Sequence, residues 1–534
     1  GGLLPSTRLV SNNVHAEAKV PVYDAKFSQL HMQLGQFAAH DVIRMPSAVG
    51  KNNVALDCNA CSSSSSSKNC APIAVPDGDG YFPSRDSSGN AQCIRFTRII
   101  NGQTHFGERA QINQNTHFLD LSTLYGSTDC ESRAIRSFRN GMMATYTNGN
   151  FYLPPQAPND TNCQSTSLGY PCFLAGDFRS TLHPGLPPVH TIFVRLHNNF
   201  ASKIAEMRPW WTEEDIYQET RRFLVAIWQK IIYTEYLPTI IGEKKLDEYK
   251  LRPSGLSNLF NEAVNPSVSG EFGAAAFRFG HSQARDNFAR TDQNNRTTAS
   301  PIGIGDNVFY SDRFYERPST VFEVAHGMMF AQAMAVDRQF SFPIRHQLFE
   351  TRNKKASGVD LVAVNIQRGR DLGLHPYNDV RERIGLRRAN SFDDLKKDMA
   401  AENVELLKKT YKSVEDIDLY TGLLLENVVD KTAILGPVGS TIIVEQFASW
   451  KRGDRFFYEN AKVSGGLNSD EYEAIRNYTL SQLLCETVTE TDSIPRNPFV
   501  VGSPKVACSS FKAFPLDRVL SSFGRYGRNN WKYY

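Results

Sequence analysis

The chain has 534 residues, of which 41% are hydrophobic, with 59 Lys and Arg against 56 Asp and Glu. This apolar fraction excludes wholesale disorder, and the nearly balanced charge gives no basic field for nucleic acid. No apolar run approaches the roughly 18 residues of a membrane span. No repeat or sharp change in composition divides the chain, so we interpret residues 1–534 as one unit with a large buried core.

Helical periodicity dominates the sequence and predicts helices near residues 26–43, 188–207, 212–236, 319–336, 396–410, 440–450 and 469–484. Thr212 and Asp215 have the spacing of a capping box, and Pro238 predicts the end of the helix that they begin. Strand-like alternation is sparse. The sequence therefore predicts a mainly α fold with little β structure and long irregular connections.

The cysteines indicate the compartment. Of nine, four cluster within 36 residues, a pattern typical of disulfide loops or of a metal site: Cys58, Cys61, Cys70 and Cys93. A zinc site would need a second pair with C-x2-C spacing, which is missing. The first five residues, GGLLP, have no signal-peptide pattern, which suits either a processed or a cytosolic protein. Three glycosylation sequons, at Asn159, Asn295 and Asn477, join the cysteines in favouring an oxidising, secreted or extracellular location.

Residues 35–41 (GQFAAHD) carry the first functional pattern. Gln36 and His40 are four residues apart and share one helix face, while Asp41 is rotated by about 100°. One face can thus offer an imidazole and an amide to a ligand, and the neighbouring carboxylate can serve another site. The alternative is a partly buried structural histidine beside a surface aspartate.

Further segments follow in a fixed order: THFLDLS at 116–122 with LYGS at 124–127, AGDFR at 175–179, AFRFGH at 276–281, NIQRGRDLG at 365–373 and RGDRF at 452–456. Together with the segment around His40, they resemble the animal haem peroxidases of the peroxidase–cyclooxygenase superfamily, over roughly residues 1–515. The resemblance implies a single large helical haem peroxidase domain. It also implies a secreted enzyme that reduces hydrogen peroxide through a compound I intermediate.

The resemblance assigns the oxygen side of the haem to three residues. His40 would be the base that moves a proton between the two peroxide oxygens, because imidazole can accept and donate near neutral pH. Arg179 would stabilise charge on the departing oxygen. Gln36 would orient a water or a halide.

On the opposite side of the haem, His281 would bind the iron, and Asn365 would accept a hydrogen bond from its second ring nitrogen. Arg278 and Arg368 would pair with the haem propionates. Without the resemblance, each arginine could equally be an ordinary surface ion pair and His281 a structural residue.

The resemblance also implies a calcium site. Its oxygen donors would be the side chains of Asp41, Thr116, Asp120 and Ser122 and the carbonyl of Phe118, a set that suits a hard cation. Calcium would then hold His40 in place through its immediate neighbour. The alternative is a Thr/Asp/Ser turn with no ion.

Two positions depart from the mammalian-type members, which form ester bonds to haem from an Asp just before the distal His and a Glu three residues after the catalytic Arg. Here these positions are Ala39 and Leu182, and His183 stands where the strongest chlorinating members have Met. We therefore expect haem b held without covalent bonds, with a lower potential. Phenols, tyrosyl groups and easily oxidised halides or pseudohalides are expected donors, rather than chloride. Pairing of His183 with an edge group of the haem is one interpretation, and an ordinary loop histidine is the simpler one.

The disulfide pairing that the resemblance implies is Cys58–Cys70, Cys61–Cys93, Cys163–Cys172 and Cys485–Cys508. Cys130 is left over, either free and buried or linking two chains.

Two other functions compete with this one. Residues 451–454 (KRGD) contain an RGD triplet, as in the peroxinectins, so an adhesion protein that binds an integrin or another cell-surface partner is the alternative, with or without catalysis. The second is a fatty-acid dioxygenase of the cyclooxygenase branch, but that branch's radical-tyrosine motif has no clear equivalent here.

Overall fold

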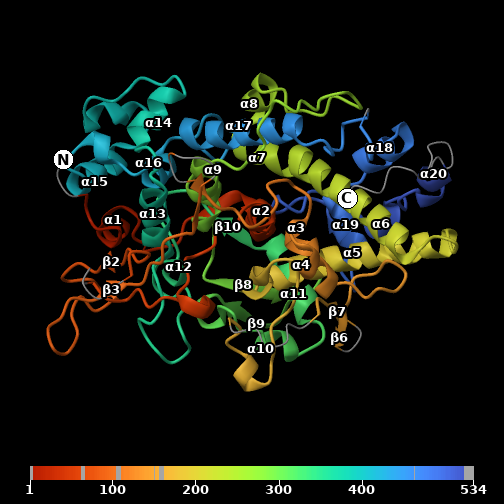
Figure 1. Cartoon of the computed structure of the whole chain (residues 1–534), viewed down its shortest axis with the longest axis horizontal. Coiled ribbons are helices and arrows are strands. Elements are labelled where there is room, and N and C mark those ends of the chain that lie inside the picture. Colours follow the sequence, from red (N-terminus) through yellow and green to blue (C-terminus); the bar gives the residue numbers. More distant parts are fainter. Residues whose placement is uncertain are drawn as a thin grey trace.

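The computed structural model describes residues 4–17, 19–61, 67–103, 107, 110–148, 151–155, 162–461 and 463–521. Helices form the body of the molecule (Figure 1). Those of eight residues or more are α1 (Thr7–Val14), α2 (Gln29–Val42), α5 (Leu186–Met207), α6 (Glu213–Ile231), α11 (Thr320–Phe330), α13 (Leu361–Leu372), α15 (Ala401–Thr410), α17 (Pro437–Gly453), α18 (Ser469–Arg476) and α19 (Leu480–Thr487).

Shorter helices connect these: α3 (Ser122–Tyr125), α4 (Asp129–Ala134), α7 (Leu237–Ile241), α8 (Glu243–Glu248), α9 (Gly270–Ala274), α10 (Asp312–Tyr315), α12 (Phe342–His346), α14 (Tyr377–Arg383), α16 (Leu419–Leu425) and α20 (Leu516–Ser521). The strands of the described residues form only antiparallel pairs: β1 (Tyr23–Ser28) with β10 (Gln332–Met334), β2 (Ile73–Ala74) with β3 (Cys93–Ile94), β4 (Asn101–Gly102) with β5 (Ala110–Gln111), β6 (Tyr146–Asn148) with β7 (Phe151–Leu153), β8 (Asn287–Thr291) with β9 (Thr297–Gly303), and β11 (Ser493–Pro495) with β12 (Lys505–Ala507). The prediction of a mainly α fold with little β structure is confirmed.

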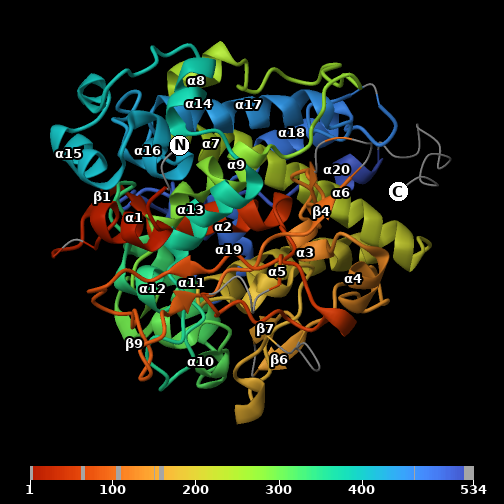
Figure 2. The same cartoon turned by 60° about the vertical axis from the view of Figure 1, so that its left-hand side comes forward.

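Helix α2 lies at the centre of the molecule in both views (Figures 1 and 2) and packs against α3, α5, α11 and β10. All of its residues are buried except Gln36 and Ala39, which are partly exposed. A helix that is buried on nearly its whole surface is typical of such a central position, although α2 also buries polar side chains such as His31 and Gln33. At Gly35 a side chain is excluded, because a Cβ there would overlap the hydroxyl of Tyr236.

Helix α6 begins where the sequence predicts. The Thr212 hydroxyl accepts from the backbone N–H of Asp215, and the Asp215 carboxylate accepts from the backbone N–H of Thr212, so the capping box is confirmed. The prediction that Pro238 ends this helix is wrong. The chain continues through a π-helical turn, Ile232–Tyr236, into α7, where Pro238 occupies the first turn. A proline there needs no N–H, so the helical path bends and continues.

Other boundaries shift by a few residues or divide. The predicted helix at 319–336 ends at Phe330 and gives way to β10, and the one at 469–484 is two helices, α18 and α19. Between these two, Thr479 caps the second helix by accepting from the backbone N–H of Gln482. Polar residues that prefer cap positions can thus interrupt an apolar period that looks continuous in the sequence.

All four disulfides that the resemblance implied are present: Cys58–Cys70, Cys61–Cys93, Cys163–Cys172 and Cys485–Cys508. The zinc interpretation of the first four cysteines is therefore wrong. Cys130 is unpaired and exposed on α4, so a buried position for it is also wrong.

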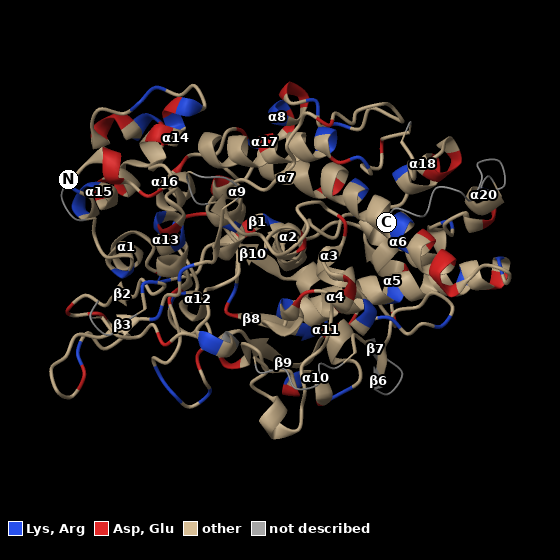
Figure 3. Ribbon diagram, in the orientation of Figure 1, with Lys and Arg blue, Asp and Glu red and all other residues tan. Residues whose placement is uncertain are grey.

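Lysine and arginine alternate with aspartate and glutamate along the outer helices, for example on α6 and α14 (Figure 3). Within the described ranges, no helix is both long enough and apolar enough to cross a bilayer.

Candidate functional site

A cavity of about 410 Å³ lies between α2 on one side and the short helix Ala276–His281 (η5) with α13 on the other. His40 and His281, which are far apart in the chain, both line it. So do the other residues that the sequence assigned to haem contact: Gln36, Ala39, Arg179, Leu182, Arg278 and Arg368. We call this space the central cavity.

His40 projects from α2 into the central cavity and is almost fully buried. Its ring nitrogen Nδ1 has no hydrogen-bond partner. Burial first, and then the nearby Arg179 guanidinium, hold the pKa of His40 well below its usual value. The imidazole is therefore neutral near pH 7 and able to accept a proton.

Arg179 is positioned by a buried carboxylate that the sequence analysis did not identify. Asp177 accepts from Arg179 at Nε, 2.8 Å, and at Nη2, 2.5 Å. Arg179 Nη2 also donates to the carbonyls of Ile43, at 2.8 Å, and His40, at 3.3 Å, at the end of α2. Burial alone would raise the pKa of Asp177, but the Arg179 charge and its hydrogen bonds lower it below the usual range. The guanidinium is thus fixed beside His40.

Gln36 is tied to His183. His183 Nε2 donates to Gln36 Oε1 at 2.6 Å, and His183 Nδ1 accepts from the backbone N–H of Gly185 at 3.2 Å, which defines a neutral tautomer. The His183 ring also stacks on Phe288. His183 belongs to the loop before α5 and lines the central cavity. The Gln36 oxygen is occupied, which leaves its amide N–H groups to face the cavity.

On the other side, His281 Nδ1 and Asn365 Nδ2 are 2.8 Å apart, and Asn365 Oδ1 accepts from Arg278 Nη1 at 2.7 Å. The predicted partners meet, but the amide is reversed relative to the prediction, because the oxygen faces the arginine. A half-turn about Cβ–Cγ would present the oxygen to Nδ1–H and leave Nε2 of His281 free to bind a metal. It would also turn the amide N–H groups toward Arg278, whose Nη1–H would then need another acceptor. Burial lowers the pKa of His281 to about 3, so the ring is neutral.

The two arginines on this side of the cavity differ in whether a carboxylate balances their positive charge. Arg368 pairs with Asp371 at 2.7 Å. Arg278 contacts the Gly273 carbonyl, Asn365 and the Met45 sulfur, and its described surroundings contain no carboxylate partner. Burial lowers the pKa of Arg278 to about 10. A buried cation without a counter-charge is costly, so this wall of the central cavity is suited to an anionic ligand.

Beside α2, Asp41 points away from the central cavity toward residues 116–123. Its carboxylate accepts from Trp228 Nε1 at 2.9 Å and from the backbone N–H of Leu121 at 3.1 Å. Ser122 links the group, since its hydroxyl donates to Asp41 and its N–H donates to Asp120. Burial, and then the charge of Asp120, raise the pKa of Asp41 well above its usual range.

The predicted calcium ligands also include Thr116 and Phe118 of the same loop. The Thr116 hydroxyl donates to Asp120 at 2.7 Å. Burial likewise raises the pKa of Asp120. Among the residues with described positions, no cluster of three or more His, Cys, Asp or Glu could hold a metal, so a cation here would depend on neutral oxygens as well. Two buried carboxylates sharing one serine fit such a cation.

Sequence reasoning missed Tyr236 and Arg95, which line the central cavity, and Asp177, which holds Arg179. Asp177 lies inside the AGDFR segment and could have been found there. Tyr236 and Arg95 come from segments that carry no local signal, and only the fold brings them to the central cavity.

The family model of the animal haem peroxidases matches residues 1–499. The chain belongs to the animal haem peroxidase family. It is 44% identical to Heme peroxidase 2 of Caenorhabditis elegans over 97% of this chain and 72% of that protein. It is 32% identical to Chorion peroxidase of Drosophila melanogaster over 91% of this chain, but it spans only 60% of that protein. These relatives identify a haem-dependent peroxidase as the class of enzyme.

Solved structures share the fold of the peroxidase–cyclooxygenase superfamily. Peroxidase A from Dictyostelium discoideum superposes with a TM-score of 0.78 at 26% identity, covering 93% of this chain and 92% of that one. A fatty acid α-dioxygenase from Oryza sativa superposes with a TM-score of 0.71 at 18% identity, covering 94% and 81%. The second likeness concerns the fold alone.

The Asp177–Arg179 pair gives a test of stability. Replacing a buried carboxylate leaves the guanidinium uncompensated, so Asp177→Asn should lower the free energy of unfolding by about 3 kcal/mol near pH 7. Because the folded pKa of Asp177 is depressed, its contribution is present above the unfolded value of about 3.9 and is lost as pH falls through the folded value. Urea unfolding at several pH values should therefore show a difference from wild type that narrows below about pH 4.

The matched control is Asp77→Asn. Asp77 is 77% exposed and lies 3.7 Å from Arg85, so its loss should change stability by less than about 1 kcal/mol. Equal effects of the two substitutions, or a gap that does not depend on pH, would contradict the role given to Asp177.

Proposed function

We propose that this chain reduces hydrogen peroxide at a haem b held in the central cavity and oxidises small donors, chiefly phenolic or tyrosyl groups and easily oxidised halides or pseudohalides. The observation that carries the proposal is that two neutral histidines and an uncompensated arginine line one cavity. Haem needs an axial nitrogen on one face, a reactive group on the other and cations for its propionates. The lining residues supply all three.

The residues present fit a haem bound without covalent links. His281 would hold the iron, and Asn365, after the half-turn of its amide, would fix the ring tautomer. Arg278 and Arg368 would hold the propionates. Ala39 and Leu182 line the cavity with aliphatic side chains that cannot form esters.

The haem supplies the iron at which the O–O bond is cleaved. The chain's own residues would handle the protons and the charge. His40 would take the proton from the peroxide oxygen that lies nearer the iron. It would then return this proton to the other oxygen, which leaves as water. Arg179, held by Asp177, would stabilise the charge on the leaving oxygen. Gln36, with its oxygen fixed by His183, would orient water or a halide through its N–H groups.

Calcium is the second cofactor that we propose, bound by Asp41, Thr116, the Phe118 carbonyl, Asp120 and Ser122. Its charge would stabilise the ionised forms of the two buried carboxylates, which burial disfavours. Because Asp41 follows His40 directly in α2, the ion would also fix the helix that carries the base.

Secretion is supported by the four disulfides, which persist in oxidising compartments. Asn295 and Asn477 are exposed and accessible to glycosylation, whereas Asn159 lies outside the described residues.

Cell adhesion through residues 451–454 is not proposed. These residues form the end of α17 rather than an exposed turn, and Asp454 is only 5% exposed. Its carboxylate accepts from Gln229 Nε2 and from the backbone N–H of Phe456. An integrin would reach this aspartate only after local unfolding.

The role of His40 predicts that His40→Ala slows the reaction with peroxide by about 10²–10⁴-fold. Stopped-flow mixing of the haem-loaded protein with peroxide would measure this from the Soret absorbance. Since the pKa of His40 is depressed, the wild-type rate should not fall as pH is lowered through about 6.5, where an ordinary histidine becomes protonated. The control His326→Gln removes a buried histidine of α11 that bonds Thr491, away from the central cavity, and should leave the rate unchanged. An unchanged rate in His40→Ala would remove this residue from its role.

The absence of carboxylates at positions 39 and 182 predicts that acid–butanone extracts all haem from the wild-type protein, even after turnover with peroxide. Leu182→Glu restores a carboxylate at the cavity wall and should retain part of the haem on the polypeptide. Haem that stays with the wild-type chain would contradict non-covalent binding.

The calcium proposal predicts about one calcium per chain by elemental analysis and less in Asp120→Asn. At calcium concentrations about 100-fold above its dissociation constant, chelation should remove about 2.7 kcal/mol of stability. Asp86→Asn, at an exposed turn aspartate, is the control and should keep its calcium. Equal calcium content and equal thermal stability in the two variants would exclude Asp120 as a ligand.

A further inference from the structure

A second, larger space adjoins the central cavity. This outer cavity has a volume of about 880 Å³ and shares Arg95, Arg179, Leu182 and Phe349 with the central cavity. Pockets of this size hold molecules much larger than peroxide. Its other lining residues come from the disulfide-tied segment 59–95, from positions 162, 164 and 178, and from residues 308–309 and 349–358. A molecule bound in the outer cavity would therefore lie next to the central one.

One wall of the outer cavity is a row of three phenyl rings. Phe178 lies 6.4 Å from Phe309 between ring centroids, with planes 16° apart, and Phe309 lies 6.1 Å from Phe349, with planes 19° apart. Phe349 is 39% exposed, so part of its ring is open to the cavity. Phe178 is 42% exposed, but the guanidinium groups of Arg44 and Arg179 lie over its ring, 5.2 and 6.0 Å from the centroid. Parallel, offset aromatic faces are a surface on which another planar ring can stack.

The backbone holds two of these rings in a conformation that bulky residues rarely adopt. Phe309 has a φ of +56° and Phe349 a φ of +60°. Neighbouring contacts maintain both: the Phe309 N–H donates to the Leu182 carbonyl, and the residue after Phe349, Glu350, accepts from the Tyr81 hydroxyl and the Ala356 N–H. Such strain persists where the surroundings enforce it, often at binding sites.

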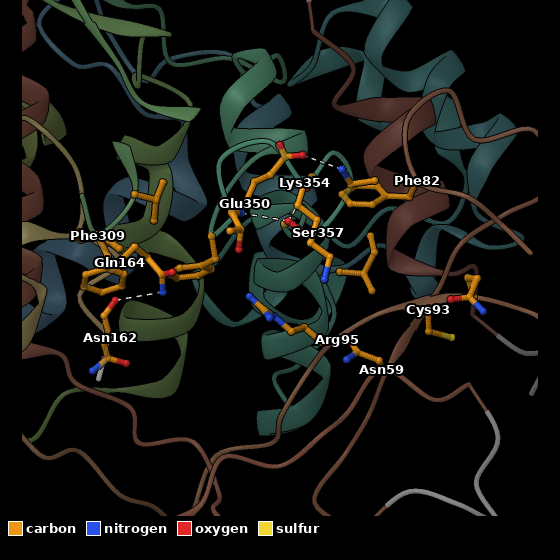
Figure 4. A pocket seen from close by; sticks show the side chains of 18 of the residues that line it. Asn59, Phe82, Cys93, Arg95, Asn162, Gln164, Phe309, Glu350, Lys354 and Ser357 are labelled. Atoms are coloured by element: carbon orange, nitrogen blue, oxygen red, sulfur yellow. Dashed lines mark hydrogen bonds between the residues drawn. The ribbon is translucent and has the colours of Figure 1, made fainter. Parts of the chain in front are cut away.

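The charges of the outer cavity are predominantly positive. Arg95 and Lys354 line it, and in the described part of the chain no carboxylate forms an ion pair with either. Figure 4 shows both side chains in the middle of the cavity, between Phe309 on one side and Phe82 on the other. The one acidic residue of the wall, Glu350, is engaged by Tyr81 and Ala356. The space therefore favours an anionic group near an exposed phenyl ring.

We propose that the outer cavity binds the electron donor, and that this donor is a phenol carrying a carboxylate. Its ring would stack on Phe349, its carboxylate would pair with Arg95 and Lys354, and its hydroxyl would face the central cavity. This proposal rests on the proposed peroxidase function and narrows its donor class. In each cycle two phenols lose one electron and one proton each, giving two phenoxyl radicals, while hydrogen peroxide takes up both electrons and both protons to give two waters.

The test uses three donors with the same phenol and different side-chain charge: 4-hydroxyphenylacetate, its neutral amide and the cationic tyramine. With the haem-loaded wild-type protein, kcat/KM should fall in that order, the anion exceeding the amide by about tenfold. The difference should shrink at high salt. Isothermal titration of 4-hydroxyphenylacetate without peroxide should show binding independently of turnover.

The variants separate charge from stacking. Arg95→Gln and Lys354→Gln should each reduce the ratio of kcat/KM for the anion to that for the amide. The reduction should come from a higher KM for the anion. Phe349→Gly, which suits the positive φ, should raise KM for all three phenols by about threefold to tenfold. Arg85→Gln removes a 58% exposed cation that lines neither cavity and should change none of these values.

Two outcomes would overturn the donor proposal while leaving the peroxidase function intact: equal kcat/KM for the three phenols, or equal loss for all three in Arg95→Gln together with loss of haem. The latter would show that Arg95 holds the haem and not the donor. Failure of the wild-type protein to oxidise any donor, iodide included, despite bound haem would instead refute the proposed function.

Discussion

The arrangement of both sites depends on the angle between the side chains of two consecutive residues in a buried helix. His40 and Asp41 are adjacent in α2, but helix geometry directs their side chains about 100° apart. One lines the central cavity, and the other joins a buried group of oxygens around Ser122. Since α2 is packed on nearly its whole surface, any shift of the helix would move both side chains together. The positions of the two side chains are therefore coupled through a single peptide bond.

The arginines and lysines that line the cavities differ in whether a carboxylate balances their charge. Arg179 is matched by Asp177, and Arg368 by Asp371, so each is fixed before anything binds. Arg278 in the central cavity and Arg95 and Lys354 in the outer cavity have no such partner among the described residues. Uncompensated cations lie along both cavities, which is consistent with anions at both: propionates inside and a donor's carboxylate outside.

Local sequence signals predicted elements well where the deciding interaction is local. The capping box at Thr212 involves two residues three positions apart, and it forms as expected. Pro238 was misjudged because its effect depends on the π-helical turn before it, which removes the need for its missing N–H. The buried position of Asp454 was equally invisible, because Gln229, which binds its carboxylate, lies far away in the chain.

The sequence by itself determined the family, through motifs whose residue types and order are specific, and with it the helical fold, the disulfide pairs and the residues that gather at the central cavity. Tertiary structure alone decided how those residues are supported. The hydrogen bonds from Arg179 to the end of α2, the bond from His183 to Gln36, the meeting of Asn365 with His281 and Arg278, and the two strained phenylalanines of the outer cavity all depend on contacts between distant segments. Such contacts carry no periodicity or spacing that a linear sequence could reveal, because packing in three dimensions selects them.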